Sequence, residues 1–123
     1  MSRYAAGRWL AIFYQANNLV IDEDIVGLKN SPHIVVGCPG RVNDMIRRRK
    51  LQTKKVKITV LDEADEMLSK GFKEQIYSIF HCLDEKTVQI ALFSATLSND
   101  LMVLSQKLLR NPEKILVKAE ALT

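Results

Sequence analysis

The sequence is poor in cysteine, glycine and proline, and it contains no long hydrophobic run. Its 123 residues include two cysteines, five glycines and three prolines. Two cysteines are too few for a disulfide framework or a zinc site, and we expect both thiols to be reduced. The low glycine and proline contents exclude a collagen-like or low-complexity chain. No stretch approaches the roughly 18 apolar residues of a membrane span. These absences favour one globular domain in the cytoplasm or nucleus, with no membrane contact.

A phosphate-binding loop of the form G-x-x-x-x-G-K-[ST] is also missing. None of the five glycines precedes a lysine, and no two of them are five positions apart. Such a loop surrounds the nucleotide phosphates with backbone amides and a lysine. Without it, the β- and γ-phosphates of a nucleotide would lack their backbone amides and lysine.

The charges are segregated along the chain, whose formal net charge is +4. Positions 41–57 contain eight basic residues and a single acid, Asp44, whereas four of the five residues 62–66 are acidic. A basic segment attracts polyanions such as nucleic-acid phosphates. A run such as Arg47–Lys50 is equally typical of a solvated helix end, where cations complement the helix dipole. Both interpretations remain open at this point.

From residue 33 onward, short β-branched runs alternate with apolar residues at helical spacing. The runs cover residues 34–36, 56–61, 88–93 and 115–117. The last predicted helix begins at Ser98, a good N-cap residue. This alternation predicts an α/β fold whose parallel strands are covered by helices on both faces. Earlier in the chain, residues 9–14 suit either a strand or a short buried helix, and residues 22–30 are predicted to form a short helix.

Three of the predicted strands end in polar clusters, namely residues 38–41, 62–65 and 94–96. In an open parallel sheet these carboxyl ends share one edge, where ligands bind. An aspartate at a strand exit, such as Asp62, is suited to Mg²⁺, and a carboxylate beside it, such as Glu63, can orient or deprotonate water. Each cluster also has a structural interpretation, as acids at a helix dipole, hydroxyl caps or a Pro-Gly turn.

Taken together, these motifs resemble those of the DEAD-box ATP-dependent RNA helicases. The resemblance rests on Asp62-Glu63-Ala64-Asp65, on Ser94-Ala95-Thr96 and on Pro39-Gly40-Arg41. Longer strings at 60–68, 71–77 and 115–118 are similar to the translation initiation factor 4A branch, while those at 44–49 and 94–97 are similar to its nuclear relative in the exon junction complex. The resemblance implies that residues 19–123 are the later part of a first RecA-like domain, of the P-loop NTPase type and without its phosphate-loop strand, after a divergent segment 1–18.

The resemblance also implies roles at the matching positions on the nucleotide side. Asp62 would act on Mg²⁺ through water, and Glu63 would position or activate the hydrolytic water. Asp65 would connect these two catalytic residues to Ser94 and Thr96, which couple ATP hydrolysis to strand separation. ATP and Mg²⁺ are accordingly the cofactors of the family.

On the nucleic-acid side, the resemblance implies that Pro39, Gly40 and Arg41 bind the RNA backbone. The family has threonine where this chain has Cys38, so one hydroxyl group that would contact an RNA phosphate is missing. Its paired glycines correspond here to Asn17-Asn18. The implied partners are RNA and either an initiation-factor scaffold or exon junction proteins.

The sequence thus predicts part of an ATP-dependent RNA helicase that is inactive as an ATPase in isolation. The alternative is a non-enzymatic, truncated fragment that binds RNA or a helicase partner. In the family, the missing phosphate-loop strand lies centrally in the sheet. Its loss predicts an exposed sheet edge and self-association, unless residues 9–14 or a second copy of the chain cover that edge.

Overall fold

The structure is a computed structural model and describes residues 9–13 and 34–117. The described elements, in chain order, are β1 (Trp9–Phe13), β2 (Ile34–Gly37), α2 (Pro39–Arg47), β3 (Val56–Leu61), α3 (Ala64–Ser69), α4 (Lys73–His81), β4 (Gln89–Leu92) and α5 (Asn99–Leu108). The expected helix over residues 22–30 and most of the segment 1–18 lie outside these ranges.

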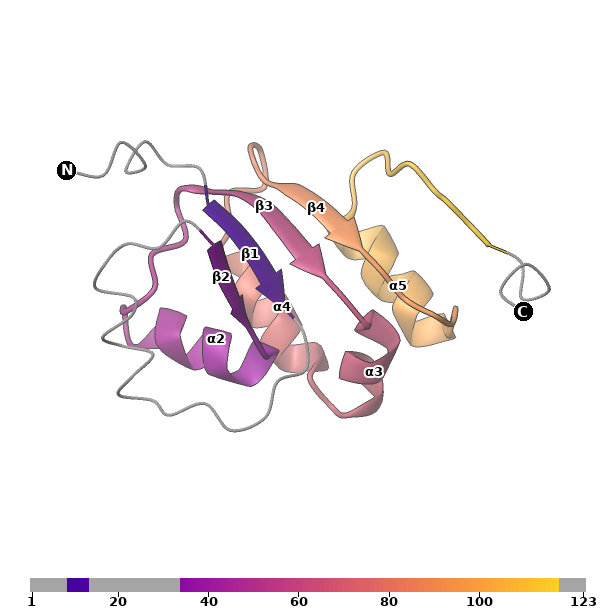
Figure 1. Cartoon of the computed structure of the whole chain (residues 1–123), viewed down its shortest axis with the longest axis horizontal. Helices are drawn as coiled ribbons and strands as arrows, with labels where there is room; N and C mark the ends of the chain where they lie inside the picture. Colours follow the sequence, from indigo (N-terminus) through magenta and orange to yellow (C-terminus); the bar gives the residue numbers. More distant parts are fainter. Residues whose placement is uncertain (1–8, 14–33, 118–123) are drawn as a thin grey trace.

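The four described strands form one parallel sheet in the order β2-β1-β3-β4 (Figure 1). Residues 9–14 suited either a strand or a helix by sequence, and the structure shows that residues 9–13 form strand β1. This strand lies between β2 and β3. Its Leu10 pairs with Ile34 on one side and with Ile58 on the other. Within the described sheet, β2 and β4 are the edge strands.

The hydrophobic core lies on one face of the sheet, where it contains side chains from all four described helices. Figure 1 shows α4 and α5 behind the strands. Leu61 and Thr59 of β3 point into this layer and are fully buried, whereas Ile58, on the opposite face of the same strand, is 41% exposed. Ile34 and Phe93 are exposed by 58% and 56%. The described helices thus pack on this one face, and the prediction of helices on both faces stays a prediction, because the helix expected over residues 22–30 lies outside the described ranges.

The ends of the elements follow local sequence signals in most places. Ser98 caps α5 as predicted, because its Oγ accepts a hydrogen bond from the Leu101 amide at 3.2 Å. The predicted strand at residues 115–117 is wrong. Ile115, Leu116 and Val117 are exposed by 89%, 72% and 60% and belong to no strand. A strand needs a neighbour for its backbone hydrogen bonds, and this segment pairs with none of the described strands.

Candidate functional site

Parallel strands bring the three predicted polar clusters to one edge of the sheet, as expected from the sequence. The strand order then decides which clusters meet. β3 and β4 are neighbours, so residues 62–65 and 94–96 lie side by side. Two backbone hydrogen bonds join them: the Phe93 amide donates to the Leu61 carbonyl at 2.8 Å, and the Ala64 amide donates to the Phe93 carbonyl at 3.0 Å. Residues 39–41 follow β2 and are separated from β3 by β1.

Asp65 and Thr96 make the central contact between the two adjoining clusters. The Thr96 hydroxyl donates to Oδ2 of Asp65 at 2.9 Å, across 31 positions of sequence. The loop around it is fixed by Ser94, whose hydroxyl donates to the Thr96 carbonyl at 2.8 Å. The structure therefore brings together all three residues that the sequence predicted to act as a coupling group.

Hydrogen bonding lowers the pKa of the Asp65 side chain. Burial alone raises the pKa of this carboxyl, but hydrogen bonds from the Thr96 hydroxyl and the Glu66 amide outweigh burial and hold the pKa below its ordinary value. The Glu66 amide lies 3.0 Å from Oδ1 of Asp65. At neutral pH the Asp65 carboxylate is thus a charged acceptor that ties the end of β3 to the loop after β4.

Asp62 and Glu63 stand at the exit of β3, and both are exposed. The Glu63 amide donates to Oδ1 of Asp62 at 2.9 Å. Glu63 has left-handed backbone angles, with φ 54° and ψ 46°, immediately before α3. This conformation costs a non-glycine residue about 1–2 kcal/mol. Such strain concentrates at functional sites, because the surrounding structure must hold the residue there.

The acidic and hydroxyl clusters line an open groove of about 570 Å³. Its lining consists of Asp62, Glu63, Asp65, Glu66, Phe93, Ser94 and Ala95. Among the described residues, no group of three or more histidine, cysteine, aspartate and glutamate side chains is arranged to hold a metal ion. A single carboxylate still fits Mg²⁺ when water and nucleotide phosphates supply the remaining oxygens. Asp62 fits that requirement, since only its Oδ1 accepts the local amide.

The third cluster forms the start of α2. Pro39 is the first residue of this helix and is fully buried, so its side chain belongs to the core. The interpretation of Pro-Gly as an ordinary turn is therefore wrong, because both residues are helical. A Cβ on Gly40 would lie 3.6 Å from Cε1 of Phe72, an ordinary contact, so packing does not require glycine there. The first turn of α2 presents amides suited to an anion, with half-buried Arg41 beside them.

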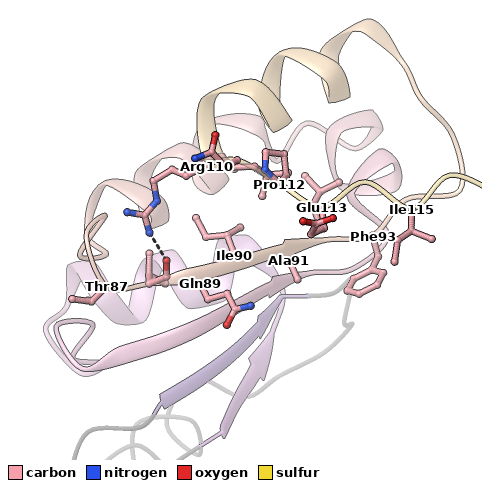
Figure 2. A pocket seen from close by; sticks show the side chains of 14 residues that line it. Thr87, Gln89, Ile90, Ala91, Phe93, Arg110, Pro112, Glu113 and Ile115 are labelled. Atoms are coloured by element: carbon pink, nitrogen blue, oxygen red, sulfur yellow. Dashed lines mark hydrogen bonds between the residues drawn. The ribbon is translucent and has the colours of Figure 1, made fainter.

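A second groove, which the sequence did not predict, runs along the edge of β4 that pairs with no described strand (Figure 2). It measures about 590 Å³ and is lined by residues 87–93 and by 108–113 with Ile115. Arg110 reaches across and donates to the Val88 carbonyl at 2.8 Å. The two residues are 22 positions apart, and no local pattern marks Arg110 as the partner of a strand edge.

Comparisons with known proteins show the family to which the chain belongs. The family model described as "DEAD/DEAH box helicase" matches residues 5–104, and the chain belongs to this family. It is 52% identical over 103 residues to "ATP-dependent RNA helicase eIF4A" of Aspergillus clavatus, covering 84% of this chain and 26% of that protein. It is 50% identical over 121 residues to the protein of the same name from Candida albicans, covering 97% and 30%. The chain thus spans between a quarter and a third of the length of these relatives.

A solved structure of a DEAD box protein from Methanococcus jannaschii is similar to this fold. The TM-score is 0.79 at 30% sequence identity, and the match covers 88% of this chain and 36% of that one. The predicted fold class, a partial RecA-like parallel sheet with flanking helices, is confirmed. In the part of the chain that the structure describes, no helix is long and apolar enough to cross a membrane.

Proposed function

We propose that this chain forms the later part of the first RecA-like domain of an ATP-dependent RNA helicase, and that in isolation it does not hydrolyse ATP. The observation that carries the proposal is the hydrogen bond between Thr96 and the Asp65 carboxylate. It joins the end of β3, where Asp62 and Glu63 would serve hydrolysis, to the loop after β4. A shift at one cluster is thereby transmitted to the other.

In this proposal, the protein's own groups orient and activate water at the end of β3. Asp62 would hold Mg²⁺ through water, and the bound ion would supply neutralisation of phosphate charge. Glu63 is exposed to the groove and can accept a proton from a water molecule there. The sequence contains no phosphate-binding loop, on which phosphoryl transfer depends, so we expect turnover by these residues alone to be negligible.

An ATPase assay with single-stranded RNA tests this part of the proposal. The wild-type chain and the Glu63→Gln variant are compared at equal concentration, because the substitution removes the base and keeps the size of the side chain. We expect both to show the same background rate. Turnover by the wild type that Glu63→Gln abolishes would show that the isolated chain is an enzyme.

RNA binding is proposed for the start of α2, with Gly40 and Arg41 in contact with backbone phosphate. Buried Pro39 would fix the direction of the helix and would not touch RNA. The further partners proposed are an initiation-factor scaffold or exon junction proteins, in the cytoplasm or the nucleus. The non-enzymatic alternative, a fragment that binds RNA or a helicase partner, uses this same surface. RNA affinity that falls with Arg41→Ala and is unchanged by ATP would support it.

Self-association through the free edge of β4 is also proposed, with a second copy of the chain as the occupant. Beside this edge, Phe93 and Ile115 are exposed by 56% and 89% and line the same groove. An uncovered apolar strand edge is a template for pairing with another chain. We expect sedimentation to show dimers that Ile115→Lys weakens. A cooperatively folding wild-type monomer at high concentration would contradict this.

A further inference from the structure

Seven basic side chains lie outside the candidate site at the carboxyl ends of the strands. We call this set of side chains the basic surface. Its members are Arg47, Arg48, Arg49, Lys50, Lys54, Lys55 and Lys57, and all seven are exposed. They occupy the last residue of α2, the connector to β3 and the beginning of β3. The chain presents them within 11 consecutive positions.

The connector that carries this surface is held in place by hydrogen bonds. The Lys50 amide donates to the Met45 carbonyl at 2.9 Å, and the Val56 amide donates to the Thr53 carbonyl at 3.2 Å. The Thr53 hydroxyl donates to the Cys82 carbonyl at 2.8 Å, which fastens the connector to the end of α4. The basic side chains are therefore attached to an ordered backbone.

The basic surface lies at the amino-terminal end of β3, whereas the candidate site lies at the carboxyl ends of the strands. α2 starts at that site with residues 39–41, and its nine residues carry the chain back by about 12 Å, at 1.5 Å per residue. The six residues of β3 then separate Lys54 and Lys55 from Asp62 by about 20 Å. In Figure 1 the connector leaves α2 at its end far from α3 and reaches the start of β3.

Acidic neighbours reduce the charge of this surface only in part. Asp44 lies 3.2 Å from the Arg48 guanidinium, one turn away on α2. Asp84 and Glu85 follow Cys82, which the connector contacts, and Lys86 comes directly after them. Among the described residues, eight cations, Lys86 included, and three acids therefore lie in this part of the chain, whereas acidic residues predominate around Asp62 at the other end of the strands.

The surroundings of these cations favour a phosphate backbone over an acidic protein. Leu51 and Val56, the apolar residues of the connector and strand start, are 6% and 3% exposed and point into the core. A protein interface is normally anchored by apolar or aromatic residues that become fully desolvated. Sequence-independent binding of nucleic acid depends mainly on cations and counterion release. The basic surface has cations and no exposed apolar anchor in the described connector.

We propose that the basic surface is a second RNA-backbone contact, separate from the contact at the start of α2. This inference rests on the proposed RNA-binding function and adds a distinct site to it. A single strand that contacts Arg41 would continue along α2 toward Lys54. The basic surface would raise affinity without reading the base sequence, because phosphate contacts carry no sequence information.

The test measures binding of the full chain to a fluorescein-labelled single-stranded oligouridylate by anisotropy, over a series of salt concentrations. The test variant is Arg47→Gln with Lys54→Gln. Its matched control is Lys70→Gln with Lys114→Gln, which removes the same charge from exposed positions outside the basic surface. Each lost phosphate contact reduces the slope of log affinity against log salt by about 0.7 for a single strand. We expect the test variant to bind about tenfold more weakly at low salt, with a slope reduced by about 1.4.

Each remaining outcome decides the question. Equal affinity and slope for the test variant and its control would overturn the inference. If Arg41→Ala still weakened binding in that case, the proposed RNA-binding function would stand. Absence of RNA binding by the folded wild-type chain would overturn both. Binding of oligoglutamate that only the test variant loses, with RNA binding unchanged, would assign the surface to an acidic protein and also refute the inference.

Discussion

The hydrogen bond between Thr96 and Asp65 allows a quantitative test of the proposed coupling site. We consider Thr96→Val, which keeps the shape of the side chain and removes the hydroxyl group. A hydrogen bond to a charged group contributes about 1.5–3 kcal/mol. Thr96 is exposed and Asp65 is partly exposed, so solvent screens part of this contribution and we expect a loss of about 1 kcal/mol. With a urea dependence of about 1.5 kcal/mol per molar, the unfolding midpoint falls by about 0.7 M at pH 7.

The effect of Thr96→Val depends on pH in a direction that the structure determines. The pKa of Asp65 is lowered in the folded chain. The stability that comes from its ionised form is therefore complete above the unfolded pKa of about 3.9 and is lost as the pH falls through the lower folded pKa. The difference in free energy of unfolding between the wild type and Thr96→Val should therefore disappear as the pH falls through that range. Urea titrations followed by circular dichroism, from neutral pH to about pH 2, measure this difference.

Thr53→Val is the matched control for this experiment. It also removes one threonine hydroxyl, whose acceptor is the neutral Cys82 carbonyl. Its cost, about 0.5–1.5 kcal/mol, should not change with pH. The reasoning would be refuted if Thr96→Val left the midpoint at pH 7 unchanged, or if its effect were the same at every pH.

Three further substitutions test the backbone strain at Glu63, the burial of Leu61 and the helix cap at Ser98. Each is measured by urea unfolding. Glu63→Asn should raise the free energy of unfolding by about 0.5–1 kcal/mol, because asparagine tolerates the left-handed backbone found there; a clear decrease would contradict the strain argument. Leu61→Ala should cost about 2–5 kcal/mol, since this side chain has no exposed surface, and a cost below 1 kcal/mol would mean that it is not in the core. Ser98→Ala should cost about 1 kcal/mol by removing the acceptor for the Leu101 amide, whereas an unchanged midpoint would exclude the cap.

Local sequence patterns predicted most of the described elements. The strand expected at residues 56–61 is β3 with the same boundaries, because alternating β-branched residues fit a strand regardless of what lies beside it. The pattern failed where the outcome depended on a distant partner. Residues 9–13 became a strand because β2 and β3 both pair with them, and residues 115–117 remained unpaired because no described strand lies against them.

For the candidate site too, the sequence predicted some features and the tertiary structure decided others. The sequence indicated that Asp62, Asp65 and Thr96 follow strands, and parallel pairing then placed them at one edge. That Thr96 donates to Asp65 follows only from the adjacency of β3 and β4. The left-handed conformation of Glu63 was not predictable, because glutamate has no preference for it.

The sequence by itself determined the kinds of elements, the strand-end motifs and the segregation of charge. These properties depend on residues close together in the chain, through periodicity, caps and composition. The tertiary structure alone decided the strand order, which face of the sheet the described helices cover and the separation of the basic surface from the acidic groove. These features depend on which distant segments pair and pack, and backbone hydrogen bonds between strands do not distinguish one apolar strand from another. The placement of the basic and acidic groups at opposite edges is thus a property of the folded chain.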